Sequence, residues 1–149
     1  MRTLLAIAGF ELRSRLKMPS TYAYFALYVA IAAFWMAAAG GAVDSAQISF
    51  GSEKVLINGP YALAQLLTLL GFMGISVIAA MMGRAVQQDF EHGTYHFFFS
   101  APIAKRDYVL GRFLGAYLTL LLVFLGVAAG ALIGLHWPGV DATRVGPTT

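Results

Sequence analysis

Three long uncharged segments alternate with shorter polar segments along the chain, and this alternation predicts its architecture. The uncharged segments cover residues 22–43, 61–83 and 113–137. A helix of 22 residues is roughly 33 Å long, which is enough to cross about 30 Å of hydrocarbon. We therefore predict an all-α membrane protein with three transmembrane helices at these positions.

The segment before the first span, residues 2–18, has the pattern of an amphipathic helix. Its apolar side chains fall within one stripe of the helix surface, with most of its basic side chains opposite; the stripe is Leu4, Leu5, Ala8, Leu12 and Leu16. Glu11 and Arg15 are four residues apart and can pair. A basic amphipathic helix usually lies in the membrane interface, with its charges toward anionic head groups. The alternative is that this helix is an ordinary soluble beginning of the first span.

Small residues recur at helical spacing before and within the third span. Glycines four residues apart let another helix approach closely; here they are Gly111, Gly115, Gly126, Gly130 and Gly134. This pattern predicts a face for helix packing, but it does not identify the partner helix. After it, Pro138 and Gly139 are expected to end the helix, and residues 141–149 form a polar tail.

Composition excludes a soluble globular domain. The chain is 59% hydrophobic and 11% charged, whereas soluble domains have about 25% charged residues. Cysteine is absent, which excludes disulfides. The net charge of +3 does not indicate a nucleic-acid partner, because the basic residues flank apolar spans and do not line one face.

The basic residues also predict the orientation in the bilayer. Residues 2–18 and residues 84–112 carry four lysines and arginines each, whereas the segments 44–60 and 141–149 carry one each. Basic residues accumulate on the cytoplasmic side of membrane proteins. We therefore expect a multi-pass protein of the plasma or inner membrane, with the N-terminus and the loop 84–112 cytoplasmic and the C-terminus outside.

Motifs of catalysis and cofactor binding are missing. The chain has neither the GxxxxGK[ST] phosphate loop nor the GxGxxG fingerprint. His92 and His96 are two possible metal ligands, too few for a structural zinc site. Glu91 beside His92 lacks a nucleophile or an enclosed pocket. We predict no catalytic, cofactor or metal site in this chain.

The loop at residues 84–112 is the most informative stretch. The second helix should continue past the membrane and end near Gly93, and Thr94 should cap a short new helix. That helix would be rich in aromatic residues and would stop at Pro102; the aromatics are Tyr95, Phe97, Phe98 and Phe99. Lys105 and Arg106 then open the third helix. Exposed aromatic patches usually mark interaction sites, so we interpret the short helix as a docking surface. Alternatively, its rings fold back into the head-group layer.

The same stretch resembles the loop of ABC-2-type permeases, the type 2 ABC exporters. In that family an acidic residue precedes Gly-Thr, and a short hydrophobic helix, a proline, basic residues and a glycine-basic pair follow. The matching residues here are Glu91, Gly93, Thr94, the segment 95–99, Pro102, Lys105, Arg106, Gly111 and Arg112. Together with the N-terminal helix, the resemblance covers about residues 2–138.

The resemblance implies a permease that exports a substrate with a cytoplasmic ATPase, which would hold the ATP and magnesium. It implies a coupling helix that contacts this ATPase; the coupling residues would be Glu91, Gly93, Thr94, Tyr95, Phe97, Phe98, Pro102, Lys105 and Arg106. Permeases of this family typically have six spans, so residues 1–149 would form a single transmembrane domain, the N-terminal half, beside a second permease subunit or half. The alternative is a three-span scaffold that recruits a cytoplasmic partner without transport. A membrane-embedded enzyme is disfavoured, because the spans lack clustered acids or histidines.

Overall fold

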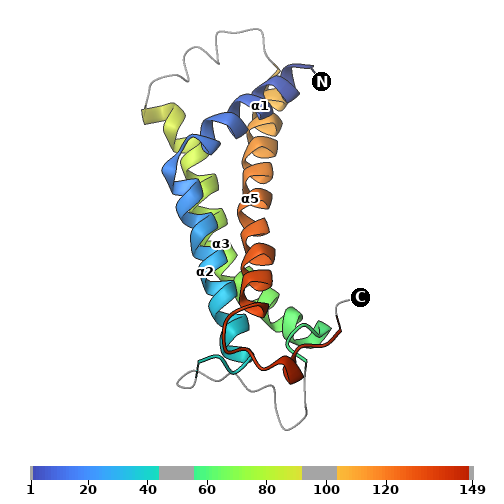
Figure 1. Ribbon diagram of the computed structural model, residues 1–149. Coiled ribbons are helices and arrows are strands. Elements are labelled where there is room, and N and C mark those ends of the chain that lie inside the picture. Colours follow the sequence, from blue (N-terminus) through green and yellow to red (C-terminus); the bar gives the residue numbers. More distant parts are fainter. Residues whose placement is uncertain (1, 44–55, 92–103, 148–149) are drawn as a thin grey trace. The chain divides into compact units, whose positions relative to one another are not determined.

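The computed structural model describes residues 2–43, 56–91 and 104–147, and these ranges are helical apart from their connections (Figure 1). The helices are α1 (Arg2–Leu16), α2 (Pro19–Ala39), α3 (Pro60–Glu91) and α5 (Lys105–Leu135), followed by a 3₁₀ turn, η1 (Ala142–Arg144). Within these ranges α2, the Pro60–Met81 part of α3 and α5 are long and apolar enough to cross a membrane. The predicted fold class, all-α with three spans, is confirmed. The predicted short helix after Thr94 lies outside the described residues.

Proline and charge explain where the helices begin and how far they extend. Both α2 and α3 begin at a proline, whose fixed φ and missing N–H suit the first helical turn. The helix α3 continues through charged residues to Glu91, and α5 begins at Lys105. Each helix that flanks residues 92–103 is therefore longer than its apolar segment.

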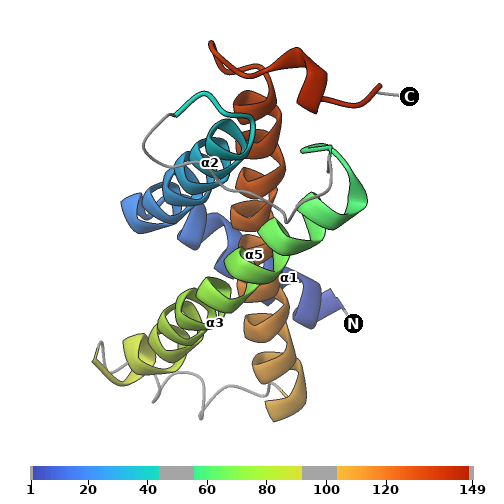
Figure 2. The same ribbon diagram turned by 90° about the horizontal axis from the view of Figure 1, so that it is seen from below.

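The chain divides into two compact units, each described here by itself. Unit 1 contains the residues up to Ala23 together with Gly74–Val123. Within it, α1 lies across the first part of α5 (Figures 1 and 2). A Cβ atom at Gly111 would lie 2.9 Å from the Cβ of Ile7, so only glycine permits this approach. Unit 2 contains Tyr24–Met73 together with Phe124–Thr149.

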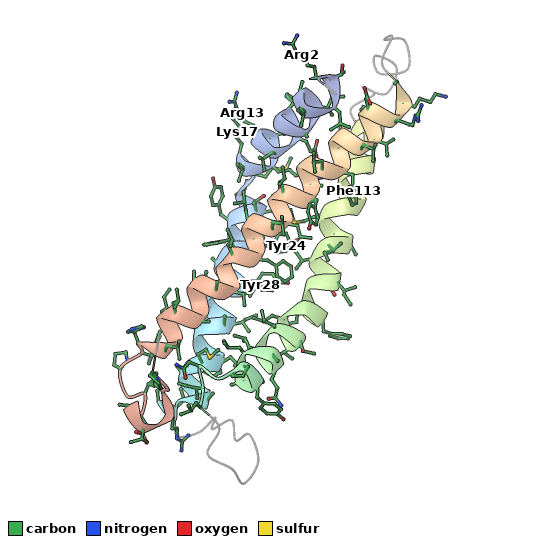
Figure 3. All side chains as sticks on the ribbon, turned by 90° about the vertical axis from the view of Figure 1, so that its right-hand side faces the viewer. Arg2, Arg13, Lys17, Tyr24, Tyr28 and Phe113 are labelled. Carbon is green, nitrogen blue, oxygen red and sulfur yellow. The ribbon has the colours of Figure 1, made fainter. Side chains whose placement is uncertain are left out.

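The face of α1 that is buried in unit 1 shares only Ala8 with the apolar stripe, which the sequence analysis assigned to an interfacial helix. Ala8, Glu11 and Arg15 are buried, whereas Leu5 is 62% exposed. The close contact with α5 selects a small residue and two paired charges for the buried face, and the position of α1 in the membrane interface stays a prediction. Arg2, Arg13 and Lys17 are exposed and point away from α5 (Figure 3).

In unit 2, α2 packs against the second part of α5 (Figures 1 and 2). A Cβ atom at Gly126 would lie 2.9 Å from the carbonyl oxygen of Phe25, and one at Gly134 would lie 2.6 Å from the Cβ of Met36. The ring of Tyr28 lies beside that of Phe124, with 5.1 Å between centroids. The glycines of α5 thus let the two backbones approach closely.

The first part of the polar segment after α5 is hydrogen-bonded to the rest of unit 2. Asp141 donates its backbone N–H to the carbonyl oxygen of Gly40 over 3.0 Å, at the end of α2. The side chain of Asn58 donates to the carbonyl oxygen of Gly146 over 2.7 Å and accepts from its N–H over 2.8 Å. Hydrogen bonds from the backbone and hydroxyl of Thr143 keep the pKa of Asp141 below its usual value. These bonds join the chain before α3 to the chain after α5.

Candidate functional site

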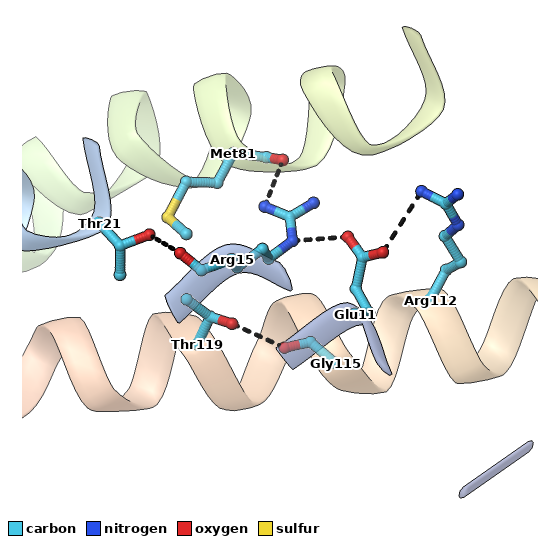
Figure 4. A network of polar contacts seen from close by, with 7 residues as sticks. All are labelled: Glu11, Arg15, Thr21, Met81, Arg112, Gly115 and Thr119. Carbon is cyan, nitrogen blue, oxygen red and sulfur yellow. Dashed lines mark hydrogen bonds and ion pairs between the residues drawn. The ribbon is translucent and has the colours of Figure 1, made fainter. Parts of the chain in front are cut away.

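Three charged side chains meet inside unit 1, with the carboxylate of Glu11 at their centre (Figure 4). Its Oε1 lies 2.7 Å from Nε of Arg15, and its Oε2 lies 3.3 Å from Nη1 of Arg112. Each carboxylate oxygen therefore has its own guanidinium partner. The side chains of Glu11 and Arg15 are each 7% exposed and that of Arg112 is 17% exposed. We call Glu11, Arg15 and Arg112 the ion network.

Arg15 extends this network to two further helices. Its Nη1 donates to the backbone carbonyl oxygen of Met81 in α3 over 3.1 Å. Its own carbonyl oxygen accepts from the hydroxyl of Thr21, at the start of α2, over 2.8 Å. The same carbonyl oxygen also accepts from the backbone N–H of Met18 over 3.0 Å. One residue of α1 thus binds α2 and α3, while Glu11 binds α5.

The contact between Glu11 and Arg112 is possible because the backbones of α1 and α5 approach each other closely at Gly115. A Cβ atom at Gly115 would lie 2.6 Å from the Cβ of Glu11, so any larger residue would push Glu11 away from α5. Thr119, on the next turn of α5, is fully buried and donates its hydroxyl to the carbonyl oxygen of Gly115 over 2.9 Å. This bond satisfies the hydroxyl within its own helix, as is common for threonine in helices. At Gly115 the face of α5 toward α1 therefore has no side chain, and the hydroxyl of Thr119 beside it is hydrogen-bonded.

Each charge of the ion network is stabilised by the opposite charge beside it. Taking an ion out of water costs several kcal/mol, and removing one partner of a buried pair leaves the other charge uncompensated. Here one carboxylate faces two guanidiniums, so a change at Glu11 would remove one ion-pair contact from each arginine. The arrangement has no nucleophile, and no group of three His, Cys, Asp or Glu side chains that could hold a metal occurs in the described ranges. The ion network can hold α1 against α3 and α5.

A comparison with protein families places the chain. The model of the family described as "ABC-2 family transporter protein" matches residues 5–145, which include every described helix apart from the first three residues of α1. The chain belongs to the ABC-2 transporter family. No curated protein and no solved structure matches the chain. It is accordingly a multi-pass membrane protein and a permease of an ABC transporter.

The coupling residues that the sequence predicted for this ABC-2 permease lie around residues 92–103. Glu91 is the last residue of α3, and Lys105 and Arg106 are exposed in the first turn of α5. The others, Gly93, Thr94, Tyr95, Phe97, Phe98 and Pro102, lie outside the described residues. At 1.5 Å per helical residue, Met81 is about 15 Å before the end of α3 and Arg112 about 10 Å after the start of α5.

The five glycines of this ABC-2 permease that were predicted to pack lie against two different helices. Gly111 and Gly115 face α1 within unit 1, and the remaining three face α2 within unit 2. The pairing of Glu11 with Arg15 was predicted from their spacing and is confirmed. The contacts with Arg112 and Met81 were missed, because they join residues far apart in the sequence. The available signal was the position of Glu11 and Arg15 on the same side of α1 as Ala8.

Proposed function

We propose that this ABC-2 permease couples ATP hydrolysis by a separate cytoplasmic ATPase subunit to the export of a substrate. The observation that carries this proposal is the pair of helix ends that bracket residues 92–103. Both α3 and α5 extend beyond their apolar segments, to Glu91 and from Lys105, as helices with charged residues. Helices that project from a bilayer in this way support a connecting segment in water, where a soluble partner can bind it. Membership in a transporter family does not favour the alternative of a scaffold without transport.

In this proposal the segment 94–100 is the coupling helix. Its aromatic side chains supply the buried contact with the ATPase, and Glu91, Lys105 and Arg106 form a charged rim. ATP and magnesium are bound by the ATPase, and a second permease subunit or half completes the transporter. The distribution of basic residues supports a position in the cell membrane with the N-terminus and residues 92–103 in the cytoplasm and the C-terminus outside.

The proposal is tested by co-purification of the ATPase with variants of the permease. Truncating a central aromatic anchor often costs about 2 kcal/mol, which corresponds to roughly a 30-fold loss of affinity. Phe98→Ala should therefore release the ATPase while the permease still inserts. Arg106→Glu should weaken the complex less, and more at low than at high salt, because rim charges act through screened attraction.

Phe72→Ala is the matched control. Phe72 is 75% exposed and lies in the apolar part of α3, so this variant loses the same side chain away from residues 92–103. It should retain the ATPase as the parent does. If Phe98→Ala and Arg106→Glu also retain it at both salt concentrations, the aromatic segment is a membrane-surface anchor and the coupling proposal is wrong.

A further inference from the structure

We infer that Glu11 is a positioning residue for coupling, because it locks α1 to the helices that flank residues 92–103. This inference rests on the proposed function, since it concerns how a movement imposed by the ATPase is carried into the membrane helices. Glu11 binds Arg112 of α5 directly and binds α3 through Arg15, whose guanidinium donates to the carbonyl oxygen of Met81. Through these contacts α1, α3 and α5 respond as one body.

The geometry of the contact favours locking over sliding. The Cβ position of Gly115 lies 2.6 Å from the Cβ of Glu11 and 2.7 Å from the carbonyl oxygen of Ala8. A translation of α1 along α5 by one turn toward Thr119 would therefore bring a side chain of α5 against the backbone of α1. The bond from Arg15 goes to a main-chain carbonyl of α3, so it follows the helix axis itself and not a mobile side chain.

Stability alone does not account for three charges at this place. Replacing a buried ion pair by apolar side chains of similar volume is often neutral or stabilising, and the best-attested role of buried polar groups is to fix register. Leucines are abundant in α1, so an apolar contact with α5 was available to this sequence. A charged contact fixes the rotation and the axial position of α1, since Glu11 binds Arg112 of α5 and also binds Arg15, whose guanidinium donates to α3.

The experiment measures the distance between α1 and α5 with spin labels. The chain has no cysteine, so labels attach only where one is introduced. Gly9→Cys on α1 and Val109→Cys on α5 are suitable, because a Cβ at Gly9 meets no atom within 4 Å and Val109 is 61% exposed. The pair is measured in lipid nanodiscs, in the complex with the co-purified ATPase, without nucleotide and with a non-hydrolysable ATP analogue.

Three forms of the labelled permease are compared: the parent, Glu11→Gln and the matched control Arg13→Gln. Arg13 lies on α1 beside the ion network but is exposed, so its variant loses a charge from the same helix without breaking the lock. In the parent and in Arg13→Gln the labels should give one narrow distance that the nucleotide does not change. In Glu11→Gln the ATPase should remain bound, and the distance should shift when the nucleotide is added, because α1 no longer follows α5.

Several outcomes would overturn the inference. A distance that shifts with nucleotide in the parent shows that α1 and α5 do not move together. Equal results for Glu11→Gln and Arg13→Gln remove the role of the carboxylate. A distribution that broadens in Glu11→Gln to the same extent with and without nucleotide shows a purely structural role. Should Glu11→Gln fail to accumulate, Arg112→Gln keeps the Glu11–Arg15 pair and is judged by the same criteria.

The failure of the proposed function would be recognised separately. If no ATPase co-purifies with the parent, the coupling proposal is wrong. The fixation of α1 to α5 by Glu11 is then tested on the permease alone in nanodiscs. Glu11→Gln must there broaden the distance distribution between residues 9 and 109, and Arg13→Gln must leave it unchanged. Equal widths in these two variants would refute the lock as well.

Discussion

Substituting Gly130 by alanine tests the close packing of α2 against α5 in unit 2. The added Cβ would lie 2.8 Å from the Cβ of Ala32, and it would also meet the carbonyl oxygen of Val29. Ordinary contacts begin at 3.4 Å, so relieving the contact with Ala32 alone would require α2 to retreat by about 0.6 Å, and the closer contact with Val29 requires more. Because one of these atoms belongs to the backbone, a change of rotamer cannot relieve the overlap.

The magnitude follows from two opposing terms. A retreat of 0.5–1 Å forfeits about a quarter to a half of the dispersion energy of each contact, and overpacking typically costs about 1–3 kcal/mol. Replacing glycine by alanine inside a helix recovers about 1 kcal/mol of helix propensity. The backbone contact places Gly130→Ala at the upper end of the range, so we expect a net loss of about 2 kcal/mol.

The matched control is Gly71→Ala, also in unit 2 and within α3. A Cβ atom at Gly71 meets no atom within 4 Å, so this variant gains helix propensity of about 1 kcal/mol without a clash. Free energies of unfolding are measured in mixed micelles by titration with a denaturing detergent. Gly130→Ala should be less stable than the parent and Gly71→Ala at least as stable. Equal stability of the two variants would refute close packing at Gly130.

Two further predictions concern the connections between the spans. In the cysteine-free chain, Ser52→Cys should react with an impermeant thiol reagent added to intact cells, and Ser100→Cys should not; the reverse pattern would invert the topology. Asn58→Ala removes both hydrogen bonds with Gly146, each worth about 1 kcal/mol, so amide hydrogen exchange at Gly146 should accelerate, whereas exchange at Gly115 in unit 1 should not change. Unchanged exchange at Gly146 would show that the segment after α5 is held by other contacts.

Much of the architecture could be predicted from the sequence, because a membrane imposes simple rules on helix length and charge. The three spans followed from the lengths of uncharged segments, and the beginning of α5 followed from Lys105 and Arg106. Glycine spacing predicted close packing, but not that Gly115 faces α1 whereas Gly130 faces α2. Spacing on one helix describes a face, and the identity of the neighbour depends on the path of the whole chain. Likewise, the bonds of Asn58 to Gly146 join segments separated by two spans.

The side of α1 that packs against α5 shows why hydrophobicity is a poor guide to the protein-facing side of a helix next to a membrane. In water, leucines are driven into the core, so an apolar stripe predicts the buried face. Beside a bilayer this preference largely disappears, because lipid tails are as apolar as leucine. An exposed Leu5 then loses little, whereas the charges of Glu11 and Arg15 are stable only where partners exist. Arg112 and the carbonyl of Met81 provide those partners, and the charges, not the leucines, therefore decide which side of α1 is buried.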